Sequence, residues 1–388
     1  MSALVNKKRD SELRNAAKAF VTSFYGAVAT SDEEVRRIFQ RPGWSLFHGG
    51  IVELTDEVTT ALSRLAARAA KLLGPSGGNE KATRELALKE AQNSFTNKVP
   101  VEDAVTRLID KIFDQGTAQF EFLVPNYLLL FGDNIRSIEI GRVRAAFTAE
   151  LATEFAERAP NQRFRVIPGQ SFSLQFVGDV VHVEMFPIAW LVSVSAAKEN
   201  VEEEAKWLID VALSFLRLHY KQEGARFPTN GAIEPHPLRL KNIDNVGVKI
   251  QGTTAHLGGG SVPPAYEITA EIQAIAADPA FQDKARLIFD PPEKSVAARV
   301  SRGLGWLTRG RQAEDRAERL LYFFTAIESL LSNDDKTAPV IQTIARHAAV
   351  LLSDDINIRV KLSAEIRKLY TIRSALVHGG VRGVLGML

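Results

Sequence analysis

Cysteine is absent from the 388 residues, so the chain has no disulfide, no thiolate zinc site and no cysteine nucleophile. Long apolar runs are missing as well. The two longest, Phe122–Phe131 and Ile188–Val194, are too short for a membrane span and contain polar residues. A basic N-terminal segment is followed by Ser11 and Glu12 in place of the apolar stretch of a signal peptide. We therefore expect a cytoplasmic protein with no membrane partner.

An excess of either charge sign is also lacking, since 48 Lys and Arg face 46 Asp and Glu. This balance does not support a protein that binds a polyanion along its whole length. The apolar share of 45% and the charged share of 24% are those of an ordinary globular protein, which excludes collagen-like and wholly disordered chains. The charge is nevertheless uneven, because residues 299–388 hold 14 Lys and Arg against 9 Asp and Glu. This excess indicates either a local polyanion site or a solvated arginine-rich face.

Three regions of different character follow one another in a chain long enough for two or three domains. We predict a helical region at 1–117, an α+β domain of unknown role (sensing or regulatory) at 118–292, and an all-α helical bundle at 293–388. Apolar spacing of three and four residues predicts that the segment from 11 to 115 is helical. Individual helices are predicted at Val52–Leu73, Val101–Gln115, Ala145–Arg158, Glu199–Tyr220, Val296–Leu307, Ala313–Leu331, Ala338–Leu352 and Asp355–Val377. Alternating apolar residues predict antiparallel strands within Ile135–Val143 and at Phe164–Ile167, Phe172–Val177, Val180–Phe186, Ile188–Val194 and Gly247–His256, with a hairpin turn at Gly178-Asp179. The fold class is therefore α+β and multidomain, with a C-terminal helical bundle.

Two short motifs suggest chemistry that their contexts do not support. The segment Gly74–Gly78 matches the G-x-S-x-G pattern of a hydrolase nucleophile, Ser76, but a helix precedes it where that motif requires a strand. We interpret it as a loop that ends the helix. His182 and Glu184 share one face of a predicted strand, but no third ligand lies near them in the sequence. We therefore expect no metal site and no cofactor.

The last predicted helix carries the residues with the most informative chemistry. It contains Arg373 and His378 as an R-x4-H pair and is followed by two glycines. RNA cleavage without a metal requires an acid and a base for two proton transfers, and a cation that stabilises the charge developing around phosphorus. Histidine, with a pKa near ~6.5, serves as acid or base, and the planar fork of arginine suits phosphate oxygens. The spacing alone is not specific, because Arg41 and His48 fit a looser form of the pattern.

Three separated blocks in the last quarter of the chain are more specific. They are Phe323–Leu331 (FFTAIESLL), Ile344–Leu352 (IARHAAVLL) and Leu369–Gly379 (LYTIRSALVHG), preceded by Gly305-Trp306. In this order they resemble a HEPN domain of the Apea-like branch. The resemblance implies a metal-independent endoribonuclease, as in many members, or an inactive module that binds nucleotides or other partners, as in others. Phage defence, toxin–antitoxin pairs and RNA surveillance are frequent settings of the family.

The resemblance implies Arg373 and His378 as the catalytic pair. Ser374 follows the arginine where many nuclease members have Asn, Asp or His, and its hydroxyl can support the site by a hydrogen bond but supplies no charge. Residues five apart on a straight helix differ by about 140° around the axis, so the pair does not share one face. Either the helix ends at Gly379 and frees His378, or two protomers pair these helices into composite sites. We favour the second, and expect a homodimer that acts on RNA, with a protein or ligand partner for residues 1–292.

A structural interpretation of the same residues stays open. Glu328 lies on an otherwise apolar helix face and needs a basic partner, which Arg346 or Arg373 can supply. His378 can cap the C-terminus of its helix, where a cation is stabilised by about 0.3–1 kcal/mol, and Tyr370 can be a core residue. In the first hypothesis Glu328, Arg346 and Tyr370 support a HEPN-type endoribonuclease that leaves 2′,3′-cyclic phosphates. In the second, the chain is a non-catalytic HEPN dimer that binds RNA, a nucleotide or a protein.

Overall fold

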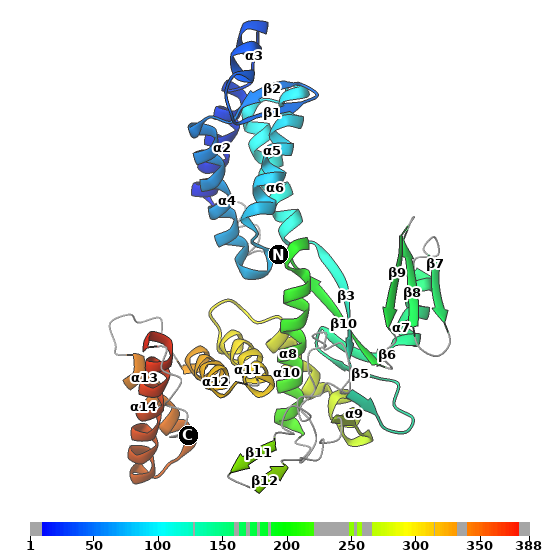
Figure 1. The fold of residues 1–388 in the computed structure, drawn as a ribbon, viewed down its shortest axis with the longest axis vertical. Helices are drawn as coiled ribbons and strands as arrows, with labels where there is room; N and C mark the ends of the chain where they lie inside the picture. The colour runs from blue at the N-terminus through cyan, green and yellow to red at the C-terminus, as the bar shows by residue number, and fades with distance from the viewer. Residues whose placement is uncertain are drawn as a thin grey trace. The chain divides into compact units, whose positions relative to one another are not determined.

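The computed structural model describes residues 10–126, 129–158, 163–167, 171–176, 179–184, 188–220, 248–251, 254–257, 266–313, 315–331 and 340–379. Contacts within the chain divide it into two units (Figure 1). The first comprises Met1–Glu121 and Ser193–Glu204, and the second comprises Phe122–Val192 and Ala205–Leu388. The three regions predicted from the sequence, with boundaries at 117 and 292, stay a prediction beside this division.

Four long helices form the core of the first unit and lie side by side in Figure 1. They are α2 (Ser11–Gly26), α4 (Asp56–Gly77), α5 (Glu80–Thr96) and α6 (Val101–Gly116). Three of them begin where a side chain accepts a free backbone N–H of the first turn, namely at Asp10, Thr55 and Asn79. Their apolar faces meet in one core, whose largest fully buried side chains include Phe20, Phe24 and Phe113. Helix α6 confirms the predicted helix at Val101–Gln115.

A short helix and a β-hairpin interrupt this helical unit. They are α3 (Asp32–Phe39), β1 (Trp44–Phe47) and β2 (Gly50–Glu53), and β1 pairs antiparallel with β2. The prediction that residues 11–115 are helical was wrong here, because the side chains of β1 alternate between outward and inward, a period of two. Gly43 and Gly50, with φ of +88° and +144°, bound the strands in conformations that favour glycine. The helix predicted from Val52 therefore begins at Asp56, and a 3₁₀ turn, η1 (Lys198–Asn200), lies in the remaining part of this unit.

A four-stranded sheet lies at the start of the second unit. It contains β3 (Gln119–Asn126), β5 (Ser137–Ile140), β6 (Val143–Phe147) and β10 (Ile188–Ser195) in the order β3-β10-β6-β5. The pairs β5–β6 and β6–β10 are antiparallel, as predicted for this region. Helix α7 (Thr148–Arg158) begins three residues later than predicted, because Ala145–Phe147 pair with neighbouring strands. A separate parallel pair joins β4 (Leu129–Phe131) to β13 (Tyr266–Ile268).

Two further groups of strands belong to the second unit. Strands β7 (Arg163–Ile167), β8 (Ser171–Phe176) and β9 (Asp179–Glu184) form an antiparallel sheet in which Phe176 lies opposite Asp179. This confirms the predicted pairing of the strands, but Asp179, predicted in the turn, is the first residue of β9. Residues 177–178 lie outside the described part of the chain. The single strand predicted at Gly247–His256 was wrong, because β11 (Val248–Gln251) and β12 (Thr254–Leu257) pair antiparallel. Alternation continues across a tight hairpin, so the pattern alone does not show the reversal.

Helices form the rest of the second unit. They are α8 (Val201–His219), which begins in the first unit, α9 (Ala270–Ala277), α10 (Pro279–Phe289), α11 (Val296–Gln312), α12 (Arg316–Leu331), α13 (Val340–Leu352) and α14 (Ile356–Gly379). The last four confirm the predicted C-terminal helical region, and the described residues from 296 to 379 contain no strand. Figure 1 shows α11 beside α12 and α13 beside α14. None of the helices in the described ranges has both the length and the apolarity needed to cross a bilayer.

Candidate functional site

Arg373 on α14 meets Glu328 on α12. Its Nη2 lies 3.6 Å from the Oε2 of Glu328, and each side chain is 23% exposed. The guanidinium also lies 5.4 Å from the centre of the Tyr370 ring, within the range of a cation–π interaction. Arg346, the other partner that the sequence allowed for Glu328, is exposed on α13. The structure therefore assigns the buried carboxylate to Arg373.

The Arg373–Glu328 ion pair leaves polar atoms unsatisfied. A separation of 3.6 Å exceeds a normal hydrogen bond, and the Nε of Arg373 and Oε1 of Glu328 are buried without a hydrogen-bond partner among the described residues. Each buried unsatisfied group costs about 1–3 kcal/mol. The pair thus positions Arg373 without using all the donors of its guanidinium.

Tyr370 packs against the same pair from one turn earlier on α14. Its ring meets Phe324 of α12 edge to face, with centroids 5.6 Å apart. Burial raises the pKa of the Tyr370 hydroxyl, and the Glu328 carboxylate raises that pKa further, while Arg373 opposes the shift. The hydroxyl is therefore neutral at physiological pH. Tyr370 is half-buried and joins α12 to α14.

The remaining predicted site residues lie on the same helices. Ser374 is half-buried on α14 directly after Arg373. Helix α14 continues through His378 and ends at Gly379, so the R-x4-H pair lies on one helix, about 7.5 Å apart along its axis. The His378 side chain lies outside the described residues. Sequence reasoning thus found one cluster, Arg373 with Glu328 and Tyr370, whereas exposed Arg346 pairs with none of its described neighbours.

The G-x-S-x-G segment has a structural role. The predicted loop was wrong, because most of the segment belongs to helix α4, which breaks at Gly74 with φ of +78° and resumes to Gly77. The backbone oxygen of Ser76 accepts a hydrogen bond from the backbone N–H of Ala197. No strand leads into Ser76, so the nucleophile motif is not formed. The other predicted pair, His182 and Glu184, lies on β9 with side chains outside the described residues. Within the described ranges, no three acidic or histidine side chains converge as metal ligands.

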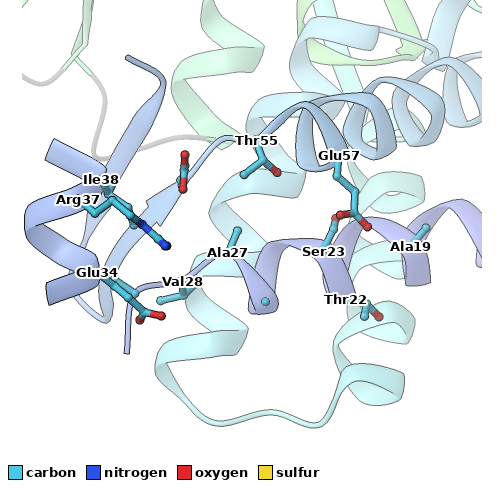
Figure 2. A pocket seen from close by; sticks show the side chains of 13 residues that line it. Ala19, Thr22, Ser23, Ala27, Val28, Glu34, Arg37, Ile38, Thr55 and Glu57 are labelled. Atoms are coloured by element: carbon cyan, nitrogen blue, oxygen red, sulfur yellow. The ribbon is translucent and has the colours of Figure 1, made fainter. Parts of the chain in front are cut away.

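Sequence reasoning missed a cavity in the first unit. Its volume is about 620 Å³, and residues of α2, α3 and the chain leading into α4 line it (Figure 2). Small residues at a spacing of three and four on α2, including Ala19 and Ser23, leave the space open, which is the signal that could have revealed it. Glu34 lines the cavity, and hydrogen bonds from the backbone and side chain of Thr30, at 2.7 and 3.0 Å, lower its pKa. This carboxylate is thus already engaged by its own chain.

Comparisons with known proteins do not place the chain in a family. No protein-family model, no curated protein and no solved structure matches it. Only the sequence blocks of the C-terminal quarter and the contacts of Arg373 therefore bear on function.

Proposed function

We propose that residues 293–388 form a HEPN-like domain that cleaves RNA without a metal ion and leaves 2′,3′-cyclic phosphate ends. The observation that carries this proposal is the placement of Arg373. Contacts from two helices hold its guanidinium, and its side chain stays about one-quarter exposed. A held, partly exposed guanidinium suits the non-bridging oxygens of a phosphodiester.

In the proposed reaction, the 2′-oxygen of a ribose attacks the adjacent phosphorus and the bond to the 5′-oxygen breaks. One proton leaves the 2′-hydroxyl and one is delivered to the departing 5′-oxygen, so the step needs no water. His378 transfers these protons, and Arg373 stabilises the added negative charge around phosphorus. Since each chain offers one such histidine on α14, a homodimer that pairs two α14 helices would supply both the acid and the base.

A second function is favoured by the ion pair itself. Glu328 offsets the charge of Arg373, and the contact with Tyr370 gives the guanidinium a packing role. An arginine engaged in this way can stabilise a helical module that binds RNA, a nucleotide or a protein without cleaving it. Retention of RNA binding without any cleavage would support this alternative.

Digestion of total RNA in EDTA separates the two functions. We expect the purified full chain to cleave RNA, and His378→Ala and Arg373→Ala to abolish cleavage. Arg367→Ala is a matched control, because Arg367 is an exposed arginine of the same helix whose Nε donates to the backbone of Ser363. This control should keep wild-type activity. Cleavage that persists in His378→Ala, or that EDTA abolishes, would contradict the ribonuclease proposal. The non-catalytic binding module would then be the remaining function.

A further inference from the structure

A group of exposed apolar side chains lies on α3 and β1 in the first unit. Phe39, Trp44 and Leu46 are 52%, 41% and 67% exposed, and the rings of Phe39 and Trp44 meet edge to face with centroids 5.0 Å apart. Contiguous exposed aromatic residues are unfavourable in water and mark interaction sites. We call these three residues the aromatic patch.

The backbone fixes the orientation of the aromatic patch. Successive side chains of β1 point to opposite faces of the hairpin. Phe47 therefore turns inward, where its ring contacts Phe24, and Trp44 and Leu46 turn outward. Gly43, with φ of +88°, makes the turn before Trp44, and its oxygen accepts a 2.7 Å hydrogen bond from the backbone of Leu54. The exposed rings are therefore held in place by regular structure and cannot turn into the core without breaking the hairpin.

Exposed basic side chains lie beside the aromatic patch, and the one carboxylate of the hairpin, Glu53 opposite Trp44, is 18% exposed and paired with Arg41. Residues 35–52 contain three arginines and one histidine but no Asp or Glu. Arg36 precedes Phe39 by three residues and so lies beside it on α3, and it pairs with no carboxylate in the described part of the chain. Arg41 is 58% exposed and pairs with Glu53 at 3.1 Å. The patch therefore favours an anionic partner that also carries flat apolar groups.

We infer that the aromatic patch binds single-stranded RNA, with bases stacking on Phe39 and Trp44 and phosphates bound by Arg36 and Arg41. Bases stack on aromatic rings regardless of sequence, and arginines beside such rings bind the connecting phosphates. A bilayer or an acidic peptide would satisfy the charge but offers no planar bases to the two ring faces. This inference rests on the proposed action on RNA, for which it supplies a second contact on the first unit.

The test compares substitutions that differ in aromaticity. Binding of a labelled, unstructured RNA 12-mer is measured by fluorescence anisotropy, with full-length protein that carries His378→Ala so that the probe stays intact. We expect Trp44→Phe to bind within about twofold of the parent and Trp44→Leu to bind about tenfold more weakly, because leucine keeps the apolar surface but cannot stack. Replacing Arg36 and Arg41 by Gln should reduce the slope of log affinity against log salt by about 1.4. Leu287→Ala, at a 55% exposed leucine of α10, is the control and should change nothing.

Three outcomes would overturn the inference. The first is that Trp44→Leu binds RNA as tightly as the parent. The second is that Trp44→Phe and Trp44→Leu lose equal RNA affinity while their circular dichroism is unchanged, and the third is that the protein binds phosphatidylglycerol vesicles in place of RNA. The inference and the proposed function fail separately. Absent cleavage with binding that depends on Trp44 refutes the ribonuclease alone, whereas cleavage with full affinity in Trp44→Leu refutes the patch alone.

Discussion

The energetic coupling between Arg373 and Glu328 is the most direct prediction of the structure. Removing either partner leaves the charge of the other unpaired at 23% exposure, beside the Tyr370 ring. We expect Arg373→Ala and Glu328→Ala to destabilise the packing of α12 on α14 by similar amounts. The double variant should cost clearly less than the sum of the two single losses, because each single loss includes the charge left unpaired.

The magnitude follows from the distance and the burial of the pair. Unit charges 3.6 Å apart at an effective permittivity of 20 attract by about 4–5 kcal/mol. Desolvation and the two unsatisfied atoms offset roughly half of this attraction. The pair therefore lies between an exposed ion pair, worth about 0.2–1 kcal/mol, and a fully buried one, whose disruption costs about 3–5 kcal/mol. We expect about 2 kcal/mol for each single variant and a coupling of about 1–1.5 kcal/mol.

Native-state hydrogen exchange of the full chain measures the loss of stability in α12 and α14 locally. It avoids a global unfolding curve, which a chain of two units need not follow as a single transition. A loss of about 2 kcal/mol predicts about 30-fold faster exchange in peptides of α12 and α14, and unchanged exchange in α2 and α4. Arg367→Ala on α14 is the matched control. Strict additivity of the two single variants would refute the coupling, and unchanged exchange in Arg373→Ala would refute the structural role of the pair.

Three further predictions follow from single residues. Burial raises the pKa of the Tyr370 hydroxyl, because the folded state favours its neutral form. The stability that neutral Tyr370 contributes is therefore full below its unfolded pKa of about 10 and is lost as pH rises through the folded pKa. At alkaline pH, the amides of α12 and α14 should exchange faster in the wild type than in Tyr370→Phe. Gly141→Ala should cost more than Gly74→Ala in thermal unfolding, because both have positive φ (+61° and +78°) but only at Gly141 would a Cβ overlap the Phe289 ring; equal losses would contradict this. Asp10→Ala should cost at least about 1 kcal/mol in thermal unfolding, because it removes both the ion pair with Arg68 and the cap of α2. Hydrogen bonds from Arg68 and Leu13 lower the pKa of Asp10, so this difference is present above pH ~4 and disappears in acid.

Local patterns were sufficient for most helices. Each of α11 to α14 was predicted because helix formation depends on spacing within a few turns and on nearby caps such as Ser295, whose side chain caps α11. The antiparallel strands from β7 to β9 followed from alternation. The errors occurred where two elements share a boundary, as at Val52, which lies in β2 rather than α4. There the pairing of β2 with β1 across a turn outweighed the helical spacing that follows.

The sequence by itself determined that Glu328 needs a cation, that Arg373 and His378 share the last helix, and that the chain can form neither disulfides nor a thiolate metal site. Only the tertiary structure decided that Arg373 rather than Arg346 meets Glu328. It also decided that the outer face of β1 stays uncovered. Both outcomes depend on how elements far apart in the sequence pack together, and the local spacing of residues carries no information about which face of one element meets which face of another.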